Sequence, residues 1–186
     1  MSTAKEPVRL ALRKLWSDHV IWTRAYVVAA VNGTPDAETA AGRLLKNQED
    51  IGAAVAGFYG QAAGDQLTEL LKEHIMIAVD LVEAAKSGDD DALSKHDGRW
   101  TTNSEAIAAF LAGANPNWPE KDVADLLALH LKLTKDEAVA RITGDWAADV
   151  KAFDDIFNEI MVLADALHDG LVAHFPDRFA GSMATA

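Results

Sequence analysis

The chain has no cysteine among its 186 residues, and it has few basic residues. The missing cysteine excludes disulfide bridges, thiolate metal sites and a cysteine nucleophile. Lysine and arginine total 17 against 29 aspartate and glutamate residues, a formal net charge of -12. Nucleic acid would be repelled by this charge and is not expected as a partner. Hydrophobic residues make up 49% of the chain, which is typical of a globular protein.

Long apolar runs and targeting signals are missing as well. No stretch approaches the roughly eighteen consecutive apolar residues that cross a bilayer. Residues 1–10 carry charges and lack the apolar run of a signal peptide. We therefore expect no membrane association and a cytoplasmic location.

The sequence motifs of common enzymes are also absent. The chain has no His-Glu-x-x-His, no Gly-x-Ser-x-Gly, and neither the phosphate-binding nor the dinucleotide-binding glycine pattern. A carboxylate-bridged di-metal site would show Glu-x-x-His on two helices. The chain offers only Asp165-x-x-His168, near the end of its last predicted helix. An ordinary hydrolase or nucleotide enzyme is disfavoured, and no catalytic residue is assigned.

One six-residue pattern occurs three times. It consists of a leucine, a bulky apolar residue, two variable positions, a histidine and an aliphatic residue. The copies are Leu15–Val20, Leu70–Ile75 and Leu126–Leu131, and a glycine follows each histidine by fourteen positions. Such repetition indicates copies of one structural unit. His19, His74 and His130 are therefore expected at equivalent positions.

Apolar residues recur at spacings of three and four along the chain, which predicts helices and no strands. Breakers such as Asn32-Gly33-Thr34-Pro35 and Asn115-Pro116-Asn117-Trp118-Pro119 separate the helices. The predicted helices cover about 8–31, 36–58, 64–87, the stretch from just after Asp89 to 112, 120–143 and 145–173.

The turns that follow the repeated histidines are short, which forces antiparallel neighbours. We predict an all-α fold: a bundle of about six antiparallel helices built from three pseudo-repeated hairpins, at about 8–60, 64–114 and 120–175. The whole chain, 1–186, is expected to form one domain with a loose tail at 180–186. The pattern leaves open whether six helices form one bundle or four form a bundle with an appended hairpin. Helix faces that stay uncovered could pair with a second copy of the chain.

The repeated histidines are the best candidates for a functional site. Each follows a large apolar residue by three positions and precedes an aliphatic one, so its side chain should point inward. If the odd-numbered helices line the centre, the imidazoles of His19, His74 and His130 converge. Three neutral imidazoles with an open fourth position suit zinc, iron, manganese or copper.

A second set of polar residues lies 28 or 29 positions after the histidines: Asn47, Asn103 and Glu159. The antiparallel helices should bring this set near the imidazoles. We expect Glu159 to supply a fourth metal ligand. Asn47 and Asn103 are expected to hold the histidines or a small cofactor by hydrogen bonds. The carboxylate breaks an otherwise symmetric set.

Two other functions stay open. Histidines hydrogen-bonded to asparagines would fix helix packing in a structural or interaction protein that binds no metal. An enzyme could instead use a histidine and a carboxylate in a pocket between hairpins, although no motif supports it. The arginines, among them Arg24 and Arg141, are expected to pair with carboxylates of the molecule itself.

Several strings together resemble a family of small bacterial helical proteins. They are Leu15-Trp16-x-x-His19-Val20-x-Trp22-Thr23-Arg24, Arg43-Leu44-Leu45-x-Asn47-Gln48-x-Asp50-Ile51, Leu70-Leu71-Lys72-Glu73-His74, Asn115-Pro116-x-Trp118, Glu137-Ala138-Val139-Ala140-Arg141 and Phe175-Pro176. The resemblance spans nearly the whole chain. It implies an all-helical bacterial protein in which the histidine and asparagine motifs belong to the family pattern, and it implies no particular activity.

Overall fold

The computed structural model describes residues 5–180, and this part of the chain folds into helices joined by short turns. It contains seven helices and no strand within that range. They are α1 (Lys5–Asn32), α2 (Ala37–Tyr59), α3 (Gln61–Ser87), α4 (Asp90–Ala114), α5 (Glu120–Thr143), α6 (Trp146–His174) and the short α7 (Pro176–Phe179). The predicted all-α class is confirmed, and each predicted helix coincides with a long helix to within a few residues.

The main differences from the predicted boundaries lie at two turns. Only Gly60, with φ of 90°, separates α2 from α3, so α3 begins at Gln61 and not near Gly64. At the other end, Pro176 does more than follow the last long helix. It begins α7, where the N–H that proline lacks would have no partner within the helix. The predicted tail lies, from residue 181 onward, outside the described residues.

The glycines that follow the repeated histidines end the odd-numbered helices. Gly33, Gly88 and Gly144 have φ of 66°, 73° and 74°, in the left-handed region that glycine enters without steric cost. Gly88 and Gly144 each donate their N–H to carbonyls of the preceding turn. The chain therefore reverses within a few residues at each of these points, and the two helices it joins contact each other.

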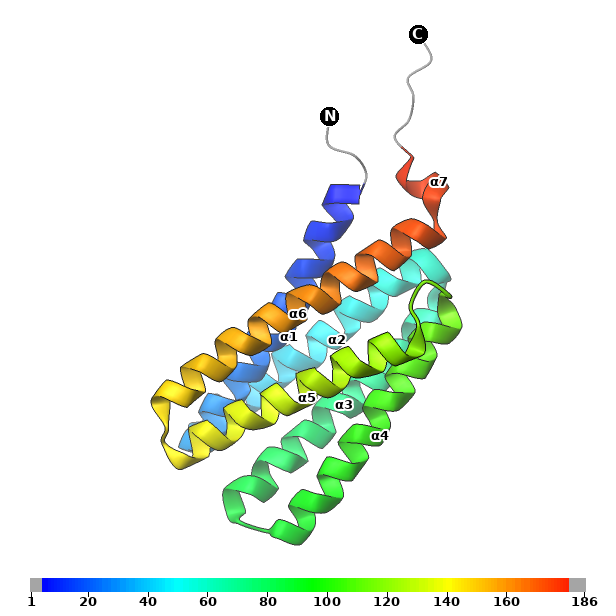
Figure 1. The fold of residues 1–186 in the computed structure, drawn as a ribbon. Coiled ribbons are helices and arrows are strands. Elements are labelled where there is room, and N and C mark those ends of the chain that lie inside the picture. The colour runs from blue at the N-terminus through cyan, green and yellow to red at the C-terminus, as the bar shows by residue number, and fades with distance from the viewer. Residues whose placement is uncertain (1–4, 181–186) are drawn as a thin grey trace.

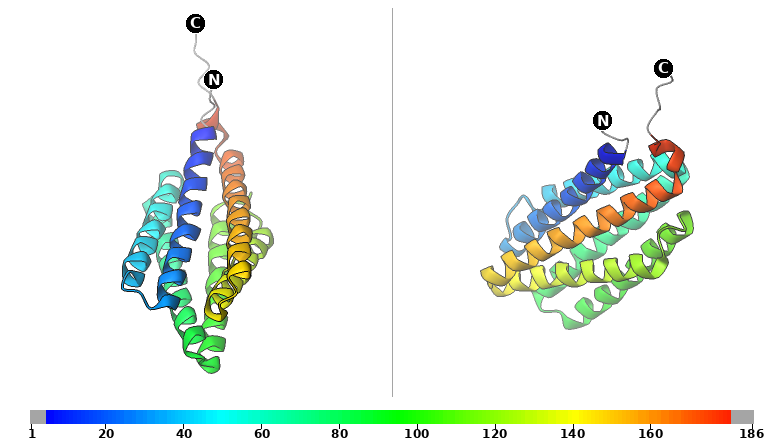
Figure 2. Two further views of the ribbon diagram at one scale, coloured as in Figure 1. Left: turned by 90° about the vertical axis from the view of Figure 1, so that its left-hand side faces the viewer. Right: turned by 45° about the horizontal axis from the view of Figure 1, so that its top comes forward.

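Each long helix contacts its neighbours in the chain, and α6 also contacts α1. The first and last long helices therefore lie side by side, as Figure 1 and Figure 2 show, although they are far apart in the sequence. Further contacts join α1, α3 and α5 to one another. Because the odd-numbered helices meet, residues at equivalent levels on them can share one site.

The largest apolar core lies on one side of the histidines. Trp16, Leu71 and Leu127, each three residues before a repeated histidine, are buried in it. Trp118, from the turn between α4 and α5, belongs to the same core, and its Nε1–H donates to the carbonyl oxygen of Leu167 at 3.2 Å. In the described part of the chain, no helix is long and apolar enough to cross a membrane.

Candidate functional site: a cavity between three histidines

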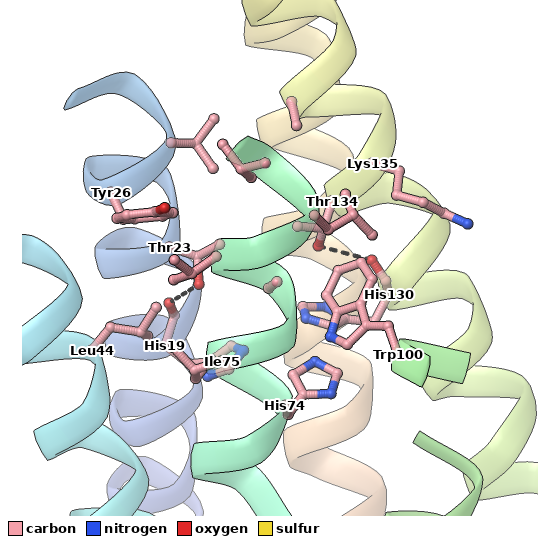
Figure 3. Close-up of a pocket in the computed structure, with 16 residues that line it drawn as sticks. His19, Thr23, Tyr26, Leu44, His74, Ile75, Trp100, His130, Thr134 and Lys135 are labelled. Carbon is pink, nitrogen blue, oxygen red and sulfur yellow. Dashed lines mark hydrogen bonds between the residues drawn. The ribbon is translucent and has the colours of Figure 1, made fainter. Parts of the chain in front are cut away.

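The three repeated histidines meet where α1, α3 and α5 come together. His19, His74 and His130 are 3%, 3% and 4% exposed. The ring centroids of His19 and His130 are 5.5 Å apart, and those of His74 and His130 are 6.4 Å apart. Figure 3 shows the three side chains at similar levels on their helices, lining one pocket. The structure thus brings the imidazoles together, as their spacing predicts.

A small cavity lies between the imidazoles. Its volume is about 20 Å³, which is enough for one water molecule or one ion. Most of the other lining residues are apolar, among them Leu44, Ile75 and Val82. Trp100 adds an N–H donor, whereas Lys135, which also lines the cavity, pairs its Nζ with Asp97 at 2.7 Å. A largely apolar cavity with a few converging polar groups is suited to one small ligand.

Each histidine is held by a side chain 29 residues further along, on the next helix of the chain. The pairs are His19 Nδ1 with Gln48 Nε2 at 3.3 Å, His74 Nδ1 with Asn103 Oδ1 at 2.9 Å, and His130 Nδ1 with Glu159 Oε2 at 3.1 Å. All three contacts use Nδ1. Within residues 5–180, no Nε2 atom of these histidines forms a hydrogen bond, so Nε2 is the nitrogen left free in each ring.

The partner of His19 differs from the predicted one. Asn47 donates its Nδ2–H to the carbonyl oxygen of Leu15 at 3.0 Å, and the adjacent Gln48 contacts the imidazole. Neighbouring residues on a helix point about 100° apart, so the difference between 28 and 29 positions decides which side chain reaches the histidine. Asn47 therefore supports His19 only through Gln48, whose amide donates to Asn47 Oδ1 at 3.2 Å.

The side chain of Asn103 both donates and accepts a hydrogen bond, whereas a carboxylate such as that of Glu159 can only accept. The amide of Asn103 donates to the carbonyl oxygen of Leu70 at 3.1 Å, while its Oδ1 accepts from His74. Glu159 carries two oxygens in place of the amide. Its Oε2 accepts from His130, and its Oε1 is buried with no hydrogen-bond partner in the described chain. The carboxylate therefore leaves one acceptor unsatisfied at a buried position.

The hydrogen-bond partners fix which nitrogen carries the proton in each neutral ring. The partners of His74 and His130 are oxygens that accept, so these rings carry their proton on Nδ1 and have a free lone pair on Nε2. Gln48 offers an N–H to His19, so that ring carries its proton on Nε2. The three Nε2 positions therefore provide two lone pairs and one N–H.

Burial keeps the imidazoles of His19 and His74 neutral. The pKa of His74 is lowered to about 3, first because burial disfavours the charged ring and second because His130 lies nearby. Burial, followed by the proximity of His130 and His74, lowers the pKa of His19 well below its usual value. The neutral imidazole is the form that binds metal ions.

Trp100 is a residue of the site that the sequence interpretation missed. It lies on α4, is 2% exposed, and its ring centroid is 5.0 Å from that of His74. It lines the histidine cavity, and its buried Nε1–H has no hydrogen-bond partner among the described residues. The sequence spacing could have indicated Trp100, because it precedes Asn103 by three positions and so lies one turn away on the same helix face.

A second polar layer, here called the arginine layer, consists of the buried carboxylates of Glu137 and Asp149 and the partly buried Arg24 and Arg141. Arg24 contacts Glu137 and donates to both carboxylate oxygens of Asp149, at 2.8 and 3.1 Å. Arg141 Nη1 lies 3.3 Å from Asp149. Burial raises the pKa of Glu137 to about 7, although contact with Arg24 opposes the rise. The predicted pairing of Arg24 and Arg141 with carboxylates of the molecule is confirmed.

The Asp165-x-x-His168 pair has other partners. Asp165 accepts from Arg13 Nε at 2.8 Å. His168 Nδ1 lies 2.8 Å from an oxygen of Asp169, and its Nε2 lies 3.2 Å from the carbonyl oxygen of Lys5. Across residues 5–180, no group of three or more histidine, aspartate or glutamate side chains is already arranged to hold a metal ion. The three central imidazoles are close together without forming a ready-made ligand set.

No family model, no curated protein and no solved structure matches the chain. The resemblance to a bacterial helical family therefore stays a prediction. The geometry of the histidine cavity alone carries the functional proposal.

Proposed function

We propose that the protein binds one divalent metal ion through Nε2 of His19, His74 and His130. One observation carries the proposal: a partner on the neighbouring helix engages Nδ1 of each ring, which leaves three Nε2 positions for one cavity. Histidine ligands of metals commonly hydrogen-bond through their other nitrogen in this way. The cavity volume of about 20 Å³ favours an ion over a larger organic cofactor.

Metal binding requires a small contraction of the site. Around a tetrahedral ion with metal–nitrogen distances of about 2.0–2.1 Å, ring centroids would lie about 5 Å apart. The separation of His19 from His130 is 5.5 Å, and that of His74 from His130 is 6.4 Å. His74 and His130 therefore have to approach each other by roughly 1 Å.

His19 also has to free its Nε2 lone pair. Gln48 Oε1 is buried with no hydrogen-bond partner in the described chain. A half-turn of the Gln48 amide would bring this oxygen to Nδ1 of His19, but it would break the hydrogen bonds that Gln48 Nε2 donates to the carbonyl oxygen of Leu44 at 2.8 Å and to Asn47 Oδ1 at 3.2 Å.

Glu159 acts on the metal through His130. A carboxylate that accepts from Nδ1–H strengthens Nε2 as a ligand and offsets part of the charge of the ion. A glutamine or asparagine would serve packing better, because its amide could also donate to a carbonyl as Asn103 does. Because Glu159 contacts His130 and does not ligate the metal itself, the fourth coordination position stays open.

We also infer that the six long helices form one closed bundle of three hairpins copied from one unit. The same 29-residue separation joins each histidine to its partner. A left-handed glycine ends each odd-numbered helix, and these three helices contact one another. A site on the common axis of such a bundle draws one ligand from each copy.

The metal proposal is tested by measuring zinc, cobalt and manganese bound to protein purified without a polyhistidine tag. We expect one equivalent of metal and a higher melting temperature after metal addition. Glu159→Gln should weaken binding by about 10- to 100-fold, and His74→Ala should weaken it further. Glu137→Gln, which changes another buried glutamate on a different layer, should leave affinity nearly unchanged. Equal metal binding by the wild type and His74→Ala would contradict the proposal.

A structural role is the second candidate, because no ligand set is already arranged for a metal among the described residues. Under that role His74→Ala leaves Asn103 without its partner and lowers the free energy of unfolding by about 1–3 kcal/mol. The loss would be the same with and without added metal. Thermal unfolding at several metal concentrations distinguishes the two roles.

A further inference from the structure

A second pocket, here called the outer pocket, shares a wall with the histidine cavity. It has a volume of about 270 Å³, lies where α3, α4 and α5 meet, and is lined in part by the exposed residues Asp90 and Val139. Leu81, Lys135 and Ala138 line both the outer pocket and the histidine cavity. Movement of this shared wall alone would therefore connect the buried imidazoles with solvent.

An ion pair crosses the shared wall. Lys135 Nζ on α5 lies 2.7 Å from Asp97 Oδ1 on α4, and the two side chains are 36% and 42% exposed. In Figure 3 the side chain of Lys135 leads away from His130, with its nitrogen at the far end. Exposed ion pairs contribute little free energy and are screened by salt, so this link between the two helices opens easily.

Trp100 lies behind this ion pair. Asp97 precedes Trp100 by three positions, so the two residues share a face of α4. The indole packs with Leu81 and Leu131 in a small apolar cluster and lines the histidine cavity. On another side of the histidines lies the largest apolar core, where an opening would expose much more apolar surface. A movement of α4 away from α5 is therefore a less costly way to reach the imidazoles.

We propose that water and single small ions reach the histidine cavity through the outer pocket, and that the ion pair of Asp97 with Lys135 is the latch that holds this entrance closed. The latch then sets how often the cavity exchanges its contents with solvent. The inference does not depend on the proposed metal function, because the passage of water alone defines the entrance.

The test measures hydrogen exchange of indole N–H groups by ¹H–¹⁵N NMR, in the full chain in heavy water with a chelator present. The buried N–H of Trp100 has no partner in the described chain, so its exchange reports water that enters the cavity. Rates are taken relative to Trp146, which is 57% exposed. We expect Asp97→Asn to speed the exchange of Trp100 about two- to fivefold. Trp118, whose N–H is bonded to the carbonyl oxygen of Leu167, should exchange at an unchanged rate.

Two further variants isolate the latch. Asp136→Asn removes the partner of Lys132 in an exposed ion pair on the same helix, and should leave the exchange of Trp100 unchanged. Asp97→Lys combined with Lys135→Asp rebuilds the ion pair with reversed charges and should restore the slow exchange. Exchange in this double variant as fast as in Asp97→Asn would overturn the inference.

The other outcomes are equally decisive. Equal exchange of Trp100 in the wild type and Asp97→Asn would overturn the inference, and so would an equal acceleration of Trp118, which would indicate a general loosening of the fold. If Asp97→Asn does not fold, the wild type decides: about 1 M sodium chloride should speed the exchange of Trp100 and not that of Trp118, and no change at Trp100 would overturn the inference. A failure to bind zinc would overturn the metal function and leave this inference standing.

Discussion

The histidine layer is formed by the three histidines, their partners Gln48, Asn103 and Glu159, and Trp100. It shares α1, α5 and α6 with the arginine layer, lies about two turns from it on α5, and differs from it in how buried polar groups are paired. In the arginine layer two guanidinium groups meet two carboxylates, and one buried atom, Arg141 Nε, has no hydrogen-bond partner in the described chain. In the histidine layer several buried groups have no partner within the described chain, namely Gln48 Oε1, Trp100 Nε1 and Glu159 Oε1. The histidine layer thus holds more unpartnered buried atoms than the arginine layer, and a ligand bound there, as proposed above, would account for that difference.

The two layers also respond to acid in opposite ways. The neutral histidines have pKa values lowered by burial, so the unfolded chain binds protons that the folded protein does not. Their contribution to stability is complete above about pH 6.5 and is lost as the pH falls. Glu137 has a raised pKa of about 7, so its contribution is complete at low pH and is lost as the pH rises towards 7.

The largest expected effect comes from breaking the paired layer. Arg24→Met leaves the buried carboxylates of Glu137 and Asp149 without their main partner, and should lower the free energy of unfolding by about 3–5 kcal/mol. Urea denaturation at pH 7 measures this. Arg13→Met, which breaks a more exposed pair with Asp165, is the control and should cost much less. Equal losses in the two variants would show that burial does not distinguish the arginine layer.

Because the two layers respond to acid in opposite ways, removing a titratable group from each should change the pH dependence of the free energy of unfolding in opposite directions. His74→Gln should remove about 1.4 kcal/mol of acid destabilisation for each pH unit below 6.5. Glu137→Gln should make the loss of stability between pH 7 and pH 5 steeper by a similar slope, because it removes the group that acid stabilises. Urea denaturation of both variants at pH 5, 6 and 7 measures the slopes. Slopes that change in the same direction would contradict the comparison.

The smallest expected effect is a difference in the free energy of unfolding between variants of two buried tryptophans, one whose N–H is hydrogen-bonded and one whose N–H is not. In metal-free protein, Trp118→Phe removes a donor bonded to the carbonyl oxygen of Leu167 and should lower the free energy of unfolding by about 1 kcal/mol. Trp100→Phe removes a donor with no partner in the described chain and should leave stability unchanged or slightly higher. Chemical denaturation in the presence of a chelator compares them. A larger loss for Trp100→Phe would mean that its N–H is already satisfied.

The helices and the level of the histidines could be predicted from the sequence because both depend on local spacing. Apolar periodicity places the helices, and Gly33, Gly88 and Gly144 end three of them with left-handed backbone. The repeat then places the histidines at one level, and contacts among α1, α3 and α5 bring them together.

The surroundings of the histidines were harder to predict because they depend on rotation about helix axes and on contacts between distant segments. One position decides whether Asn47 or Gln48 reaches His19. The contact of Arg24 with Asp149, 125 residues away, requires α6 to pack on α1, which no local spacing fixes. Trp100 was missed because the repeat includes only one residue of each even-numbered helix near the imidazoles.

The contact of α6 with α1 also sets the order in which the cavity can be assembled. His19 and His130 lie 111 residues apart in the sequence, and Glu159 follows later still. During synthesis the first two histidines leave the ribosome well before the third hairpin exists. The cavity is therefore completed late in folding, and an ion that stabilises it would act on the finished fold and not on its early intermediates.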